Sequence, residues 1–328
     1  MKTRLADCLG RAARRLACLL GVIAVQAAAQ PGAPGADCPP MPIAPSTADI
    51  QAAAVQARDR GALWRLTRDG RSSYLYGTIH VGRLAWAMPG PQLRAALGGT
   101  DIVALEIDPT DPQLAPRLAA PAAAPATLDA ALGQRLARRL DAACLPAPAR
   151  TAIAGQHPAL QAITLGVLEA RWEGLDAGYA QEFMLAGLAR AAQRRIVSLE
   201  TPESQLAALL PRDEAELRHM LEQALEQLER GQARRAIARL AAAWERGDLE
   251  ELAAYERWCE CAIDEADRRA LARLLDERNP GLAEGIDALH RAGGRVLAAV
   301  GALHMVGPKA LPELLRARGY AVERVVYR

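Results

Sequence analysis

Apolar and polar residues alternate from Leu63 to His80, on both sides of Arg68-Asp69-Gly70. A period of two is the pattern of a strand with one buried face, and an Asp-Gly pair between two such stretches favours a tight hairpin turn. Short runs rich in apolar and β-branched residues recur later in the chain and predict buried strands. These runs lie at 101–108, 194–200 and 294–301, and a last strand is predicted at 320–328.

Between these runs, apolar residues recur every three or four positions, which is the spacing of an amphipathic helix. The clearest stretch continues after Gly231, and its apolar positions are Leu217, Met220, Leu221, Ala224, Leu225, Leu228, Ile237, Leu240 and Trp244. We interpret roughly Asp213 to Arg278 as all-helical, and Pro112 to Pro125 as a Pro/Ala-rich loop.

The order of these elements predicts an α/β fold, with a central, mostly parallel or mixed sheet, flanking helices and a large helical insertion. We expect a signal peptide at 1–29, a Pro/Ala-rich N-terminal segment at 30–60 and an α/β domain at 61–328, with the helical insertion at about 126–290. No period of repeat length recurs, which argues against a solenoid.

The first residues have the three parts of a secretory signal peptide. A basic head is followed by an apolar stretch, Leu16 to Val25, and by the small residues Ala27-Ala28-Ala29, so we expect cleavage near Ala29 and a periplasmic or secreted protein. The apolar stretch is too short for a permanent membrane anchor. Cleavage removes five basic residues and one acidic residue, which changes the formal charge from +2 to −2. This near-neutral charge and the few aromatic residues argue against nucleic-acid binding.

Four cysteines remain after the expected cleavage: Cys38, Cys144, Cys259 and Cys261. An even number in an exported chain predicts two disulfides. Cys259 and Cys261 lie in a stretch that looks helical, where residues two apart point away from each other. We therefore expect each of them to pair with Cys38 or Cys144, and we keep a Cys-x-Cys metal or redox site as the alternative.

Four polar residues lie at or just past the predicted carboxyl ends of strands: His80, Glu106, Glu200 and His304. Open α/β sheets bind their ligands at that edge. The two histidines end matching Gly-x-x-His motifs that begin at Gly77 and Gly301, and glycine at these positions allows a sharp turn or the close approach of a bound group. The sequence therefore predicts one crevice that contains two imidazoles and one or two carboxylates.

Two imidazoles and a carboxylate suit zinc, manganese or cobalt, and three protein ligands leave a position for water. We expect His80, Glu106 and His304 as ligands, with the second carboxylate, Glu200, as general base or as a partner of a histidine. Structural alternatives stay open. Glu106 could bind an arginine or backbone amides, and Glu200 could cap the helix that follows it.

For the other candidate residues we expect structural roles. His157, His219 and His290 are expected in a turn, on a solvated helix face and after a helix end, respectively. Arg278 and Asn279 are a pair that could end a helix, where a basic residue meets the helix dipole. The chain has no Gly-x-Ser-x-Gly, His-Glu-x-x-His, P-loop or dinucleotide-binding motif, which disfavours those enzyme classes.

The motifs "YLYGTIHVG", "VALEID", "IVSLETPESQ", "LLDERNPG" and "VGALHMVGPKALPELLRARGY" occur in this order. From about Leu63 to Arg328 the chain resembles the TraB/PrgY/GumN family, which includes the animal Tiki proteins. The resemblance implies an α/β fold similar to that of the erythromycin-esterase and ChaN-like proteins. It also implies, from the Tiki branch, a metal-dependent protease that uses His80, Glu106 and His304, with Arg278 and Asn279 matching a further Arg-Asn motif.

Three hypotheses for function follow. The first is a metal-dependent, peptidase-like hydrolase of the periplasm that takes a peptide or small-molecule substrate, with Arg278 as an oxyanion or carboxylate partner. The second is an envelope protein that captures a peptide or other ligand in the same crevice without hydrolysis, as the pheromone-related branch of the family implies. The third is a structural partner of an envelope assembly. The oligomeric state does not follow from the sequence.

Overall fold

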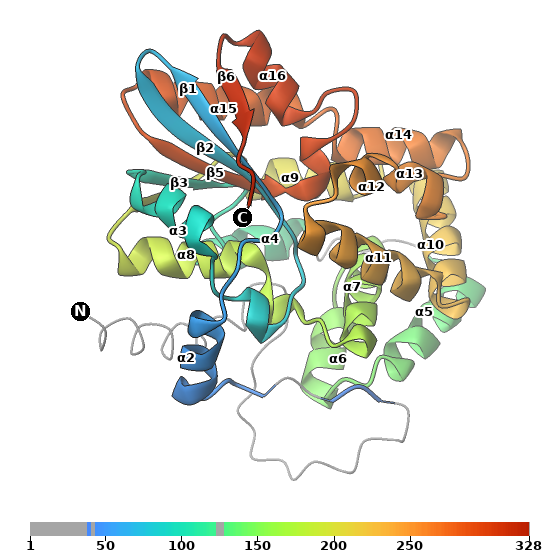
Figure 1. The fold of residues 1–328 in the computed structure, drawn as a ribbon. Coiled ribbons are helices and arrows are strands. Elements are labelled where there is room, and N and C mark those ends of the chain that lie inside the picture. The colour runs from blue at the N-terminus through green and yellow to red at the C-terminus, as the bar shows by residue number, and fades with distance from the viewer. Residues whose placement is uncertain (1–37, 41–42, 123–127, 328) are drawn as a thin grey trace.

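A computed structural model of the chain describes residues 38–40, 43–122 and 128–327. The expected signal peptide at 1–29 lies outside the described residues, as do 30–37 and 41–42 of the segment that follows it. Within the described ranges the chain forms a six-stranded sheet with helices on both faces and a helical region beside it (Figure 1). The predicted α/β class is confirmed.

The strands are β1 (Ala62–Arg68), β2 (Arg71–Thr78), β3 (Ile102–Leu105), β4 (Arg195–Ser198), β5 (Val296–Gly301) and β6 (Ala321–Arg324). They lie in the order β4-β3-β5-β2-β1-β6. The four neighbours β4, β3, β5 and β2 are parallel, whereas β1 pairs antiparallel with both β2 and β6. The sheet is therefore mixed, and the carboxyl ends of its four parallel strands share one edge.

The Asp-Gly turn forms the predicted hairpin between β1 and β2. Arg68 pairs with Arg71, and the two residues between them both have positive φ, 51° at Asp69 and 70° at Gly70. Positive φ at both positions is typical of the two-residue turn whose twist matches that of paired strands. Glycine adopts a positive φ without steric cost.

Alternation along the strands sends side chains to two separate cores. One face of the sheet, with Leu63, Tyr76 and Leu297, is covered by α3 and α8 and by part of the helical region. The other face, with Leu66 and Ala298, is covered by α15 and α16. Helices therefore cover both faces of the sheet (Figure 1).

The described helices fall into those that cover the sheet and those that form the neighbouring region (Figure 1). Their bounds are α2 (Thr47–Val55), α3 (Pro91–Gly98), α4 (Leu114–Ala122), α5 (Ala130–Ala142), α6 (Ala147–Ala154), α7 (Pro158–Leu168), α8 (Gln181–Ala191), α9 (Pro202–Leu209), α10 (Glu214–Glu229), α11 (Gln232–Arg246), α12 (Leu249–Ala253), α13 (Tyr255–Trp258), α14 (Glu265–Leu274), α15 (Asn279–Arg291) and α16 (Leu311–Ala317). Short 3₁₀ turns are η2 (Leu84–Trp86), η3 (Glu169–Glu173), η4 (Ala177–Tyr179) and η5 (Ala302–Met305).

The helical region has its own apolar core, formed by α5, α6, α7 and α10 around side chains such as Leu136, Ile153 and Leu225. The range 126–290 is not helical throughout, because β4 lies within it and belongs to the sheet. The expected Pro/Ala-rich loop at 112–125 is also wrong in part, since Leu114–Ala122 is the helix α4. Alanine has the highest helix propensity, and the favourable propensity of the alanines outweighs the cost of the two prolines in this short helix.

Two disulfides form, as predicted, but their pairing corrects the expectation. Cys38 bonds Cys144, and Cys259 bonds Cys261. The helix α13 ends at Trp258, and Glu260 has a φ of 55°, so the chain reverses direction between the two cysteines. This reversal turns the two side chains toward each other, with their Cα atoms 5.0 Å apart, within the usual range for a disulfide.

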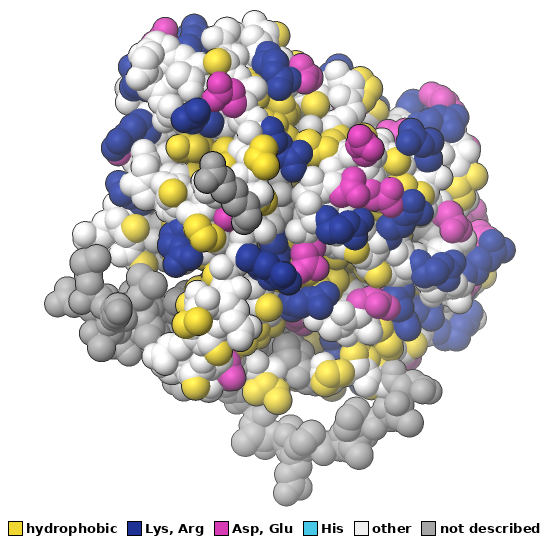
Figure 2. Space-filling view, in the orientation of Figure 1, with side chains coloured by type: hydrophobic (Ala, Val, Ile, Leu, Met, Phe, Trp, Pro, Cys, Tyr) yellow, Lys and Arg dark blue, Asp and Glu magenta, His cyan; other side chains and the backbone are white. Residues whose placement is uncertain are grey.

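Arginine and acidic side chains are interspersed on the surface of the view in Figure 2, and many form ion pairs across helices, such as Arg239 with Glu251. Exposed pairs of this kind contribute little to stability individually. No helix within the described ranges is both long and apolar enough to cross a bilayer.

Candidate functional site

The four predicted strand-end residues follow the four parallel strands. His80 lies two residues after β2, Glu106 follows β3 directly, Glu200 lies two residues after β4, and His304 lies in η5, immediately after β5. Because these strands are neighbours in the sheet, their carboxyl ends bring the four residues to one edge.

Gly301 is the point around which the two imidazoles and a carboxylate gather. Its amide donates a hydrogen bond of 2.7 Å to Oε1 of Glu106. A Cβ atom at Gly301 would lie 3.3 Å from that oxygen, 3.6 Å from Cδ2 of His304 and 3.9 Å from Nε2 of His80. Glycine leaves this space free, so the second Gly-x-x-His motif supplies both a histidine and the room beside it.

Gly77, the glycine of the first motif, has a different role. A Cβ atom there would lie 3.3 Å from both Cα of Ala302 and Cγ of Met305, in the turn that carries His304. Its carbonyl also accepts a hydrogen bond of 2.8 Å from the indole of Trp244. The first glycine thus lets the strand β2 approach the loop of the second histidine.

Arg278 connects the two carboxylates. Its Nε and Nη2 atoms donate to both oxygens of Glu200, at 2.9 and 2.5 Å, and Nη2 also donates to Oε2 of Glu106 at 2.6 Å. All three side chains are at most 11% exposed. Burial alone lowers the pKa of Arg278, but its hydrogen bonds and the charges of Glu200 and Glu106 raise that pKa overall. The guanidinium therefore remains charged.

Arg278 and Asn279 begin α15, which corrects the alternative that they end a helix. Nη1 of Arg278 does bind the carbonyl of Leu274 at the end of α14, at 3.0 Å. Glu200 likewise does not cap the following helix, because Thr201 is the N-cap of α9. The side chain of Glu200 turns instead to Arg278.

Glu106 is an ionised carboxylate held in a buried position. Burial opposes its ionisation, but the positive charges of His304, His80 and Arg278 and the amide of Gly301 lower the pKa of Glu106 to about 2. Because His304 is neutral near pH 7, Arg278 is the permanent charge that keeps Glu106 ionised there.

Asn279 determines which nitrogen of His304 carries the proton. Its Nδ2 donates to the carbonyls of Lys309, at 2.8 Å, and His304, at 3.4 Å, so its Oδ1 is free to accept from Nδ1 of His304 at 2.6 Å. Burial lowers the pKa of His304 to about 4. The neutral ring therefore presents a lone pair at Nε2, which faces Nη1 of Arg278 at 3.3 Å.

His80 is the accessible member of the group, since 63% of its side chain is exposed. Its Nδ1 lies 3.2 Å from Oε1 of Glu182, in the first turn of α8. The Glu182 carboxylate raises the pKa of His80 to about 9, an effect that water around the exposed ring screens. Sequence reasoning missed Glu182, although its place in the apolar stretch "AQEFMLAG" was an available signal.

A small pocket adjoins the loops of His304 and Arg278. Leu303 and Val306 line it on one side, and Leu275 and Asp276 on another. The remaining lining comes mainly from α12, α13 and α14. A ligand side chain could occupy this pocket.

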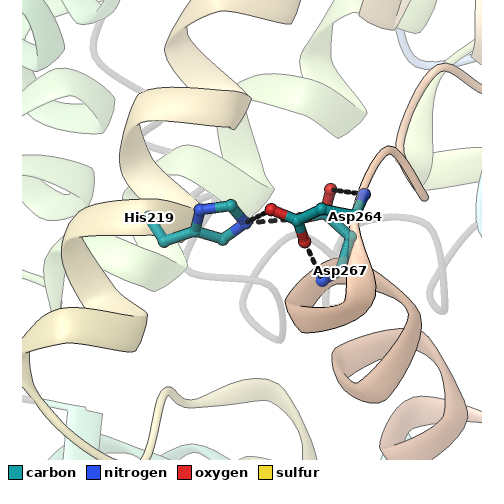
Figure 3. Close-up of side chains that lie close together, drawn as sticks. All are labelled: His219, Asp264 and Asp267. Carbon is teal, nitrogen blue, oxygen red and sulfur yellow. Dashed lines mark hydrogen bonds and ion pairs between the residues drawn. The ribbon is translucent and has the colours of Figure 1, made fainter.

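A second cluster has the residue types of a metal site, and Figure 3 shows it: His219 on α10 faces Asp264 and Asp267 at the start of α14. Nε2 of His219 lies 2.8 Å from Oδ1 of Asp267 and 3.6 Å from Oδ2 of Asp264. The two aspartates form a capping box for α14. Their positions are thus explained by the helix start and by the pairing of two helices.

Ligand spacing separates this cluster from the predicted site. Within the described residues, His219, Asp264 and Asp267 are the group whose ligand atoms all lie within 4.8 Å of one another. His80, Glu106 and His304 do not meet that spacing as a set, so one ion bound by all three requires side-chain movement.

The donor chemistry of the predicted set nevertheless fits a divalent ion. Nδ1 of each histidine is held by an oxygen, from Glu182 or Asn279, so Nε2 is the nitrogen that each ring could offer to an ion, which would displace Nη1 of Arg278 from His304. This arrangement around two imidazoles is typical of metal-binding histidines. Three carboxyl groups, those of Glu106, Glu182 and Glu200, lie at this edge with the single guanidinium of Arg278, and this composition favours a cation.

The remaining histidines have local partners. His157 caps α7, and buried His290 bonds the hydroxyl of Ser73 and the carbonyl of Arg68. His219 is not on a fully solvated face, since it pairs with Asp267.

Comparison with known proteins gives one match. Residues 62–324 match the model of the TraB/PrgY/gumN family. No curated protein and no solved structure matches the chain.

Proposed function

This chain belongs to the TraB/PrgY/gumN family, and we propose that it is a metal-dependent hydrolase of peptide bonds that acts in the periplasm or outside the cell. The observation that carries the proposal is the meeting of the two Gly-x-x-His imidazoles beside Glu106, around Gly301. The two motif histidines are 224 residues apart in sequence, and the sheet brings both to one accessible edge.

His80, Glu106 and His304 would hold the ion, with manganese, cobalt or zinc suited to this donor set. A divalent ion at such a site polarises a carbonyl and lowers the pKa of water. The exposed ring of His80 gives both ion and substrate access.

The other residues prepare the site. Asn279 keeps the proton of His304 on Nδ1, so Nε2 carries a lone pair that an ion could take in place of Nη1 of Arg278. Arg278 keeps Glu106 ionised and holds Glu106 and Glu200 in place, and its Nη1 can stabilise negative charge that develops on a carbonyl oxygen. Hydrolysis adds the hydroxyl of water to the carbonyl carbon and a proton to the departing amine.

Two disulfides support a location outside the cytoplasm, because such bonds persist in oxidising compartments. The expected leader at 1–29 agrees with that location.

A peptide library tests the function. The purified chain from Gln30 onward, with its disulfides intact, should cleave members of the library when manganese, cobalt or zinc is added. His80→Ala and His304→Ala should lose this activity, whereas His219→Ala, which alters the second cluster, should keep it. Equal inactivity of the metal-loaded wild type and His80→Ala across a broad library would refute hydrolysis.

The alternative is a protein that captures a peptide or other ligand without cleaving it. One observation favours it: Arg278 already provides a cationic partner to both Glu106 and Nε2 of His304. A ligand carboxylate or carbonyl could bind His80 and the pocket next to Leu303 while this network stays intact. A rise in melting temperature with peptide, but without metal and without cleavage, would support capture.

A further inference from the structure

One carboxylate oxygen of Glu182 receives two side chains from the end of β2. The hydroxyl of Thr78 donates to Oε1 of Glu182, and Nδ1 of His80 lies 3.2 Å from the same atom. Thr78 and His80 are two residues apart, so both project to the same side of the chain as it leaves the sheet. Glu182 therefore joins the last strand residue to the histidine beyond it.

Glu182 is itself fixed from several directions. It lies in the first turn of α8, where the helix dipole favours a negative charge. The preceding residue, Gln181, donates its amide to the carbonyl of Ile79 at 3.1 Å and its side chain to the carbonyl of Trp86 at 3.3 Å. The start of α8 is thus bonded to the loop that carries His80, and the Glu182 side chain is only 12% exposed.

We propose that Glu182 is a positioning residue that holds His80 with its proton on Nδ1 and its Nε2 toward Glu106 and Gly301. Its effect on metal binding and catalysis rests on the proposed function, but its effect on the orientation of His80 does not. An exposed imidazole without this partner would rotate freely and would favour the proton on Nε2, which would block that atom as a ligand.

The two motif histidines are held in the same way, which supports this role. Asn279 holds Nδ1 of His304 at 2.6 Å, just as Glu182 holds Nδ1 of His80. Each imidazole then directs the opposite nitrogen into the crevice. Glu182 and Thr78 fix the orientation of the exposed His80 ring, as Asn279 and burial fix that of the His304 ring.

Three variants test the proposal in the full chain. Glu182→Ala removes the acceptor, and Glu182→Gln keeps an oxygen that can accept from both Thr78 and His80. Glu203→Gln is the matched control, because it changes an exposed glutamate of α9 that pairs with Arg117. Circular dichroism and melting temperature show that each variant is folded.

The first measurement needs neither metal nor activity. Long-range ¹H–¹⁵N NMR at pH 10, with His80 assigned through its loss in His80→Gln, reports which ring nitrogen carries the proton. Wild type, Glu182→Gln and Glu203→Gln should show the proton on Nδ1, and Glu182→Ala should shift it toward Nε2. The same tautomer in wild type and Glu182→Ala would overturn the proposal, whatever the protein's activity.

The second measurement is the affinity for Mn²⁺ or Zn²⁺ by calorimetry. Loss of an outer partner of a metal-binding histidine costs about 10- to 100-fold in affinity. Glu182→Ala should weaken binding by that factor, Glu182→Gln by less, and Glu203→Gln not at all. A wild type that binds no metal, with the NMR result as expected, would contradict the proposed function and leave the positioning role standing.

Discussion

Oδ1 of Asn279 lies 2.6 Å from Nδ1 of His304, and both side chains are buried. The same asparagine donates to two backbone carbonyls, so one side chain fixes both the loop and the tautomer of the histidine. His304 is therefore held as a neutral imidazole near pH 7, with its proton on Nδ1.

Asn279→Ala should destabilise the protein by about 1 to 3 kcal/mol, because buried polar groups would lose their partners. Urea denaturation measures the change. Gln161→Ala is a suitable control, since Gln161 also donates to two carbonyls but lies in α7, with no imidazole beside it. An equal cost for the two variants would show that the His304 contact adds nothing.

Arg278→Met should be more damaging, because it leaves two buried carboxylates without their positive partner. Breaking a buried ion pair costs about 3 to 5 kcal/mol. Arg117→Met is the matched control, since Arg117 pairs with Glu203 at the surface, and exposed pairs contribute about 0 to 1 kcal/mol. Adding Glu106→Gln and Glu200→Gln to Arg278→Met should restore part of the lost stability, and no recovery would argue against unpaired charge as the cause.

The stability of the wild type should fall in acid partly through Glu106. Its folded-state pKa of about 2 lies below the value of 4.5 for an unperturbed glutamate. The resulting stabilisation is present above about pH 4.5 and is lost as the pH falls toward 2, with about 2 kcal/mol lost by pH 3. Urea denaturation at pH 6 and pH 3 should show a larger loss for wild type than for Glu106→Gln, whereas identical pH dependence would contradict the low pKa.

The two disulfides should differ in their contribution to stability. Cys38–Cys144 joins residues 106 apart in sequence, whereas Cys259–Cys261 joins residues two apart. Chain entropy predicts a contribution about 3 kcal/mol larger for the longer loop. Melting and urea denaturation of the two double Cys→Ala variants should therefore rank Cys38/Cys144 as the more destabilised, and the reverse ranking would contradict a chain-entropy origin.

The parts of this molecule that follow local patterns were predictable from the sequence. Alternation and the Asp-Gly turn predicted β1 and β2, and strand ends predicted the places of His80 and His304. The partners of these histidines were not predictable in the same way. Glu182 lies about a hundred residues from His80 in sequence, and only the docking of α8 on the sheet brings it near.

The role of Arg278 shows the same limit. A basic residue before Asn-Pro is consistent with a helix end, and the sequence pattern does not reveal that two strand-end carboxylates meet it in space. The prediction of the disulfide pairing was wrong for a local reason, because Glu260 adopts a positive φ that is uncommon for a residue with a side chain.

Metal content tests the central claim most directly. The wild type, His80→Ala, His304→Ala and His219→Ala would be purified without chelators, analysed for bound elements and titrated with Mn²⁺, Co²⁺ and Zn²⁺. The account predicts about one divalent ion per chain in wild type and His219→Ala, and affinity at least about tenfold weaker in His80→Ala and His304→Ala. Retention of the ion in both of those variants, or its loss in His219→Ala alone, would contradict the account and place the metal at the second cluster or elsewhere.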